Sequence, residues 1–202
     1  MDAIRMMGIV KCFGPVRAND GIDLIVKQQE IHCLLGENGT GKSTLMNILF
    51  GLYHPDAGEI YINGEQVQIT GPLEARKYGI NFIHQEICLA ENMTITENLY
   101  LGMEKQKGLF LSKKEMTEFT QKHLDLMGLN LRADMQVQGL SIAQQQMVEI
   151  ARALFFDAKL VVMDEPTSSL TNKEVDSLFE QIEKLRKNNV SIIYISHRME
   201  EI

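Results

Sequence analysis

A glycine-rich stretch, LLGENGTGKSTL at residues 34 to 45, matches the pattern G-x-x-x-x-G-K-[ST] through Gly36, Gly41, Lys42 and Ser43. Glycines let a backbone curl so that several N–H groups point into one concavity, which suits a phosphate. An apolar run precedes the loop and a helical pattern follows it, so the positive end of a helix dipole would add to the attraction. A plain glycine-rich turn with an incidental Lys-Ser pair does not account for these flanking elements. The stretch therefore predicts a cradle for a nucleotide, in which the lysine reaches the β- and γ-phosphates and the serine ligates Mg²⁺.

Two other apolar runs end in residues that could act on such a nucleotide. LVVM is followed by Asp164 and Glu165, and SIIYIS is followed by His197. An aspartate there can hold Mg²⁺ through water, and the adjacent glutamate can polarise an attacking water. Taken alone, each is more often an ordinary polar strand end, and Gln85 after INFIH is by itself an unremarkable turn residue. Together with the glycine loop, they favour phosphate chemistry.

The segment LSIAQQQMVEIARAL predicts a helix that starts at a capping box, with Ser141 as N-cap and Gln144 as its partner. One interpretation is a well-capped amphipathic helix, and the other is that its start also binds phosphate. The residues alone leave both open. Ser112 with Glu115 and Thr171 with Glu174 match the same box, and a helix is expected over residues 43–50.

The apolar pattern predicts an α/β fold that would position these side chains. Short apolar runs before the loop, at 160–165 and at 191–197 alternate with helical segments, which favours a buried, mostly parallel sheet. Residues 3–33, together with the Asn63-Gly64 hairpin signal, predict an antiparallel β portion at the amino end. Residues 92–158 show helical patterns and no clear strand. We therefore expect an α/β core of residues 1–91 and 159–202 with a helical lobe over 92–158.

Composition narrows the class of partner. The chain has 202 residues, 45% of them hydrophobic, and a net charge of -7, which fits one soluble domain with a lobe. Nucleic-acid binding would call for a basic face, so we expect no nucleic-acid partner. The three cysteines have no CxxC spacing and are expected to be reduced thiols in the cytoplasm. No apolar run approaches the roughly 20 residues that span a bilayer, so any membrane connection is expected to go through a partner.

In their order along the chain, these stretches resemble the ATP-binding subunits of ABC (ATP-binding cassette) transporters. GENGTGKST corresponds to the Walker A loop, HQE with Gln85 to the Q-loop, LSIAQQQ to the signature, LVVMDEPTSSL to Walker B and the D-loop, and ISH with His197 to the H-loop. The finer sequence, such as AENMTITENLYLG and IYISHRMEEI, is similar to the bacterial importers of ribose and other monosaccharides. The resemblance covers the whole chain. It implies a P-loop NTPase core and an amino-terminal cassette cut short after the H-loop, with a second cassette in tandem.

The resemblance also implies a role for each position. Phe13 would stack on adenine beside Val16, while Ser43, Gln85 and Asp164 would order Mg²⁺. Glu165 would be the catalytic base and His197 would sense the γ-phosphate, with Lys42 and Gln85 completing the catalytic set. Ser141 and Gln144 would face the ATP of a partner cassette. The residues that would wrap the ATP phosphates are Gly36, Glu37, Asn38, Gly39, Thr40, Gly41, Lys42, Ser43 and Thr44.

Two departures from the family pattern concern the half-sites. The usual signature is LSGGQ, whereas Ile142 and Ala143 replace both glycines here, and Thr171 stands where the D-loop usually ends in Asp. Side chains at the signature restrict how closely its backbone N–H groups approach the facing phosphate. The two half-sites therefore need not hydrolyse ATP equally.

The implied activity is ATP hydrolysis that drives import of a monosaccharide. The implied partners are transmembrane permease subunits, a second cassette and, indirectly, a periplasmic sugar-binding protein, with the chain at the cytoplasmic face of the inner membrane. A GTPase is disfavoured because Asn172-Lys173-Glu174-Val175 lacks the Asp of N-K-x-D. A soluble ABC ATPase of translation or DNA repair, or a fragment that only binds nucleotide, remains an alternative. The sequence of this chain does not identify which sugar is imported.

Overall fold

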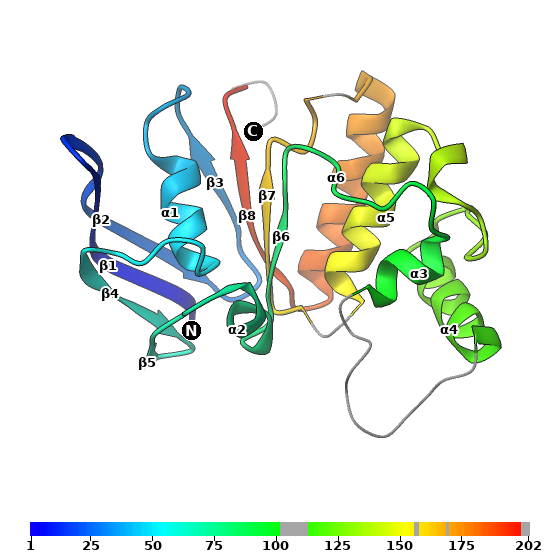
Figure 1. Cartoon of the computed structure of the whole chain (residues 1–202), viewed down its shortest axis with the longest axis horizontal. Coiled ribbons are helices and arrows are strands. Elements are labelled where there is room, and N and C mark those ends of the chain that lie inside the picture. Colours follow the sequence, from blue (N-terminus) through cyan, green and yellow to red (C-terminus); the bar gives the residue numbers. More distant parts are fainter. Residues whose placement is uncertain (102–112, 156–157, 169, 199–202) are drawn as a thin grey trace. The chain divides into compact units, whose positions relative to one another are not determined.

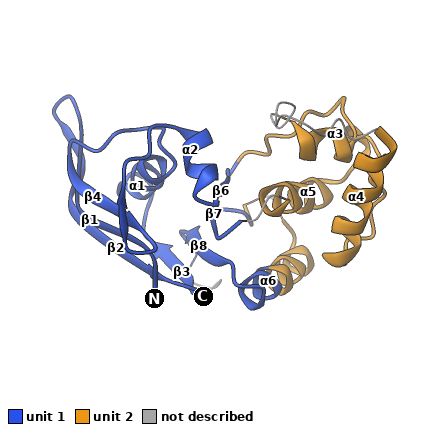
Figure 2. Ribbon diagram, turned by 90° about the horizontal axis from the view of Figure 1, so that it is seen from below, with its two compact units in different colours: residues 1–85, 157–166, 182–202 blue, residues 86–156, 167–181 orange. Residues whose placement is uncertain are grey.

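The computed structural model describes residues 1–101, 113–155, 158–168 and 170–198. These residues form two compact units. Unit 1 comprises residues 1–85, 157–166 and 182–202, and unit 2 comprises residues 86–156 and 167–181 (Figure 2). The chain first passes from unit 1 to unit 2 between Gln85 and Glu86. The domain bounds inferred from sequence remain a prediction.

The amino-terminal part of unit 1 is a four-stranded antiparallel sheet in the order β2-β1-β4-β5. Asn63 and Gly64 join the last two strands with positive φ angles of 50° and 88°, which is what a two-residue hairpin turn demands. The predicted antiparallel portion is therefore confirmed except at its end, because residues 31–33 belong to a strand of the second, parallel sheet. Its strands are β1 (Asp2–Phe13), β2 (Val16–Lys27), β4 (Ala57–Ile62) and β5 (Glu65–Val67).

The second sheet of unit 1 is parallel throughout, in the order β3-β8-β7-β6 (Figure 1). Every residue of β8 is buried, as expected for a central strand covered on both faces. Because the strands are parallel, their carboxyl ends meet at one edge, and the residues that follow them share that edge. The α/β fold expected from sequence is confirmed. The strands are β3 (Ile31–Leu35), β6 (Ile80–Ile83), β7 (Leu160–Asp164) and β8 (Ser191–Ser196).

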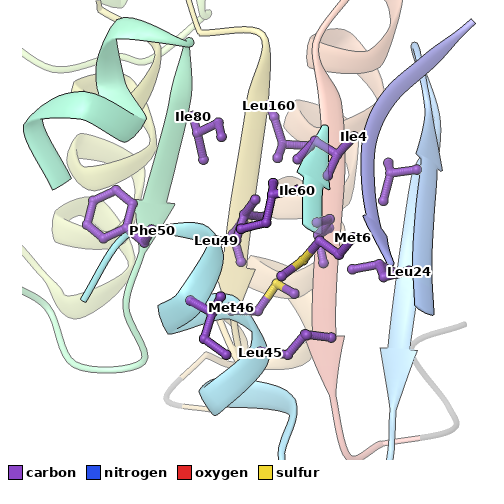
Figure 3. Packing of buried hydrophobic residues seen from close by; sticks show 14 of the residues in the cluster. Ile4, Met6, Leu24, Leu45, Met46, Leu49, Phe50, Ile60, Ile80 and Leu160 are labelled. Atoms are coloured by element: carbon purple, nitrogen blue, oxygen red, sulfur yellow. The ribbon is translucent and has the colours of Figure 1, made fainter. Parts of the chain in front are cut away.

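Helix α1 (Lys42–Leu49) connects the two sheets through one apolar core (Figures 1 and 3). It starts one residue before the predicted helix. Met46 and Leu49 are fully buried against residues from both sheets, among them Met6 and Leu160 (Figure 3). This packing fixes the helix that begins at the end of the glycine loop. A shorter helix, α2 (Pro72–Lys77), precedes β6.

Unit 2 is helical. It holds α3 (Ile95–Tyr100), α4 (Lys113–Leu126), the 3₁₀ turn η1 (Val137–Gly139), α5 (Ile142–Leu154) and the first part of α6 (Asn172–Lys187), whose second part belongs to unit 1. Among the described residues, no helix combines the length and apolarity that crossing a bilayer requires.

Capping boxes set the start of two of these helices. At α5, the Ser141 hydroxyl accepts from the Gln144 N–H at 3.3 Å and the Gln144 side chain accepts from the Ser141 N–H at 2.9 Å, as predicted. An unforeseen box caps α3 through Thr94 and Glu97. At α6, the side-chain half of the predicted box is present, because the Glu174 carboxylate accepts from both the N–H and the hydroxyl of Thr171. The box predicted at Ser112 lies outside the described residues.

Candidate functional site

The glycine loop wraps around the ammonium group of Lys42. Its Nζ donates to the carbonyl oxygens of Gly36 and Glu37 at 2.6 and 2.8 Å, and lies 3.4 Å from Oγ1 of Thr40. The Thr40 hydroxyl in turn donates to the Glu37 carbonyl at 3.0 Å. The loop thus encloses the positively charged ammonium group of Lys42.

Gly41 marks where this loop meets strand β2. Its φ is +89°, and a Cβ there would collide with the backbone carbonyl of Ala18. The Gly41 carbonyl accepts two bonds, from the Leu45 N–H at 2.9 Å and from the side-chain amide of Asn19 at 3.2 Å. A glycine is required here both for the left-handed backbone and for the close approach of β2.

Ser43 and Asp164 bring a hydroxyl and a carboxylate together at the base of the loop. Ser43 Oγ lies 3.5 Å from Oδ2 of Asp164, although 121 residues separate them in sequence. Burial raises the pKa of the Asp164 carboxyl, and the neighbouring charge of Glu165 adds to the rise, while Ser43, His84 and Lys42 oppose it. A partly buried carboxylate whose charge is disfavoured in this way is well suited to a cation ligand.

Glu165 lies at the centre of the strand-end residues. Its Oε1 is 3.0 Å from Nδ1 of His197, and its Oε2 accepts from the side-chain amide of Gln85 at 3.4 Å. Its N–H donates to the Ile195 carbonyl at 3.1 Å, so the end of the β7–β8 ladder fixes its backbone. The φ of +47° at this non-glycine residue is a strained conformation of the kind that clusters at functional sites.

A pocket of about 310 Å³ joins these parts within unit 1. Its wall combines loop amides, one lysine and two carboxylates, a donor set suited to a phosphate chain with its counter-ion. The lining residues are Val16, Arg17, Ala18, Asn38, Gly39, Gly41, Lys42, Ser43, Thr44, Gln85, Asp164 and Glu165.

Some of the predicted site residues lie outside this lining. Gly36, Glu37 and Thr40 contact Lys42 from within the loop, and His197 reaches the site through Glu165. The Phe13 ring is 42% exposed and packs edge-on against Tyr53, with ring centroids 5.2 Å apart. Ser141 and Gln144 belong to unit 2.

Sequence reasoning missed Arg17 and Ala18, which line the pocket, and Asn19, which binds Gly41. Their one available signal was position, since they directly follow Val16. Asn19 is only 4% exposed, and a buried asparagine needs a hydrogen-bond partner, which its amide finds in the Gly41 carbonyl.

Comparison with known proteins identifies the class of protein to which this fold and site belong. The sequence profile of the ABC transporter family matches residues 19–168, and the chain belongs to that family. Its similar relatives include the galactose/methyl galactoside import ATP-binding protein MglA of Clostridium perfringens, 48% identical over 199 residues. They also include the ribose import ATP-binding protein RbsA of Yersinia pestis, 49% identical over 199 residues. Each alignment covers 98% of this chain and 39% of the relative, so the chain spans about two fifths of their length.

Solved structures agree on the fold. The ADP conformation of MJ1267, an ATP-binding cassette of an ABC transporter, superimposes with a TM-score of 0.86 at 29% identity, covering 100% of this chain and 83% of that one. The dimeric cassette MJ0796 gives a TM-score of 0.82 at 26% identity, covering 98% of this chain and 89% of that one.

Proposed function

We propose that the chain is an ATP-binding and ATP-hydrolysing cassette that energises import of a monosaccharide. The observation that carries this proposal is the meeting of the Lys42 loop, Asp164, Glu165 and Gln85 in one pocket. Support for the sugar comes from relatives whose names specify galactose and ribose import. Support for ATP comes from similarity to ATP-binding cassettes, one of them in an ADP conformation.

The residues of the glycine loop would bind the triphosphate. Backbone N–H groups from Gly36 to Thr44 and the start of α1 would face the phosphates. The Lys42 ammonium, now held by loop carbonyls, would exchange part of that contact for phosphate oxygens. Phe13 would stack on the adenine beside Val16, because both side chains are exposed at 42% and 62%.

The residues at the base of the loop fit a magnesium ion. Ser43 and Asp164 offer neighbouring oxygens, and the raised pKa of the Asp164 carboxyl reflects a charge that a cation would balance. Ser43, Gln85 and, through water, Asp164 would hold the ion. When bound, Mg²⁺ would neutralise charge on the phosphate oxygens.

Glu165 would act as the general base. It would accept a proton from the water that attacks the γ-phosphorus in line, and the bond to the ADP oxygen would break. His197 and Gln85 each contact one of its oxygens and would keep the carboxylate oriented. His197 would also contact the γ-phosphate.

The proposed assembly places this cassette against a second one, with Ser141 and Gln144 facing the partner's ATP. Transmembrane permease subunits would hold the pair at the cytoplasmic face of the inner membrane, and a periplasmic sugar-binding protein would deliver the sugar. A role on ribosomes or DNA has less support, because the net charge is -7.

The substitution Glu165→Gln tests the proposal in the assembled transporter. The amide keeps the shape of the side chain but cannot take a proton at neutral pH, so hydrolysis should fall about 10²-fold or more while ATP binding stays. Glu65→Gln, at an exposed position of β5 in the same unit, is the matched control. Undiminished turnover in Glu165→Gln would refute the assigned base.

A further inference from the structure

The segment that leaves the Q-loop is held by side chains at alternate residues, all within unit 2. At Cys88, the N–H donates to Oε1 of Glu149 at 2.9 Å, and the carbonyl accepts from a guanidinium nitrogen of Arg152 at 2.8 Å. Both of these side chains come from α5, the helix that begins at Ser141. One residue of the segment is thus bound through both of its backbone groups.

Ala90 is bound in the same way by a single side chain. Its N–H donates to Oδ1 of Asn98 at 2.8 Å, and its carbonyl accepts from Nδ2 of Asn98 at 3.0 Å. Asn98 lies on α3 and donates also to the carbonyl of Thr94 at 3.0 Å. Pairing both backbone groups of every second residue is what a neighbouring strand does in a sheet, and here side chains replace that strand.

Two of the side chains that hold the segment are buried, although Cys88 itself is exposed. Asn98 and Glu149 are only 0% and 2% exposed. The second guanidinium nitrogen of Arg152 donates to Oε1 of Glu149 at 2.9 Å. Burial is also the main cause of the raised pKa of the Glu149 carboxyl. A buried ion pair often adds little net stability, and in some proteins such a pair instead fixes one arrangement of the elements that carry it.

We propose that Asn98, Glu149 and Arg152, here called the Q-loop clamp, are positioning residues that make the segment at Cys88 and Ala90 move as one body with α3 and α5. Only Glu86 and Ile87 separate Cys88 from Gln85. Consecutive Cα atoms are about 3.8 Å apart, so this linker has a reach of about 11 Å and little slack.

The consequence depends on the role of Gln85 in the proposed function. Gln85 contacts Glu165 at one end of the linker, while the clamp holds the other end to the helix that carries Ser141. A displacement of α5 would therefore reach the nucleotide site through Gln85, and nucleotide binding would in turn reach α5.

The decisive variant is the double substitution Glu149→Leu with Arg152→Met in the 202-residue chain. Replacing a buried ion pair by apolar residues of similar size often leaves folding stability unchanged, whereas the grip on Cys88 is lost. Arg152→Lys is a second variant that keeps the charge but not the fork of donors. Arg132→Lys is the matched control, since it removes an exposed guanidinium fork, to Asp134, in the same unit.

Hydrogen exchange of the Cys88 amide reads out the clamp directly, without nucleotide. We expect at least about tenfold faster exchange in the double variant than in the wild type or the control, with an unchanged urea midpoint. Equal exchange rates would overturn the clamp. This outcome does not depend on whether the chain binds ATP.

The coupling is read out with a non-hydrolysable ATP analogue and Mg²⁺. In the wild type, binding should alter exchange in α5, and in both clamp variants this change should disappear while the nucleotide Kd stays within about twofold. Retention of the change in α5, or its absence from a wild type that binds the analogue, would overturn the proposal. A wild type that binds no nucleotide would refute the proposed function, and the Cys88 exchange rates would then decide on the clamp alone.

Discussion

Nδ1 of His197 lies 3.0 Å from Oε1 of Glu165, and the two residues directly follow the neighbouring strands β8 and β7. The parallel register of these strands brings together residues that are far apart in the sequence. The side chain of Glu165 is only 12% exposed, and His197 and Gln85 each contact one of its carboxylate oxygens. The orientation of the carboxylate therefore depends on the histidine.

His197→Ala should reduce kcat for ATP hydrolysis by about 10²-fold or more, because the proposed base Glu165 would lose its orienting partner and the γ-phosphate would lose a proposed contact. The nucleotide Kd should change little, since the loop around Lys42 is untouched. Steady-state hydrolysis and equilibrium binding on the assembled transporter measure both quantities. His54→Ala, at an exposed position, serves as the control. A normal kcat in His197→Ala would contradict the assignment.

Gly41→Ala should destabilise the protein more than Gly39→Ala. Both glycines have positive φ, +89° and +86°, so each alanine incurs a backbone strain of about 1–2 kcal/mol. Only at Gly41 does the added Cβ also meet the backbone of Ala18, whereas nothing lies within 4 Å at Gly39. Urea unfolding of both variants compares them directly. Equal losses of unfolding free energy in the two variants would contradict this prediction and would show that β2 shifts to accommodate the methyl group.

Phe13→Ala should weaken ATP binding by about 5- to 150-fold, the range given by about 1–3 kcal/mol for stacking a base on an aromatic ring. Phe13→Trp should retain the affinity. The ring is half exposed and packs on Tyr53 alone among the described rings, so stability should hardly change. Phe119→Ala, which removes a ring that is 55% exposed in unit 2, is the control for binding. Isothermal titration with ATP would contradict the stacking role if the affinity of Phe13→Ala were normal.

Acid should destabilise unit 2 through His123. Burial lowers the pKa of this imidazole, and its bond to the Ala151 carbonyl opposes the shift only in part. The unfolded chain therefore takes up a proton near pH 6.5 while the folded chain resists it, so this contribution to stability is present above that pH and is lost as the pH falls.

The matched comparison is His123→Gln, which keeps a donor for Ala151 but has no imidazole to titrate. Between pH 7.5 and 5.5 the unfolding free energy of the wild type should fall more steeply than that of the variant. His54→Gln should run parallel to the wild type. Equal slopes for the wild type and His123→Gln would exclude the proposed cause.

Much of the fold followed from local patterns, and the reasons are physical. Apolar runs that end in polar residues predicted a parallel sheet, and a parallel sheet brings its strand ends to one edge. That is why Asp164, Glu165 and His197 can be expected from the sequence alone to lie together. The capping box of Thr94 with Glu97 has the same local signature, Thr-x-x-Glu, and is equally recognisable from the sequence.

Other contacts had no local signal. Asn19 binds Gly41 across 22 residues, and Glu149 binds Cys88 across 61, so neither pair forms a pattern within one element. Such contacts depend on how β2 approaches the loop and how α5 packs beside the segment after Gln85. Periodicity predicts which face of an element is buried, but not which polar group it meets there.

Every residue that lines the pocket beside the glycine loop comes from unit 1, and Gln85 is the last of these residues before the chain enters unit 2. Unit 1 thus supplies the whole lining of the pocket, and the described residues of unit 2 supply none of it. Grafting the helical part of a related cassette after Gln85 should therefore leave the residues proposed to hold this chain's own ATP in place, while Ser141 and Gln144, proposed to face a partner's ATP, would be exchanged for those of the donor.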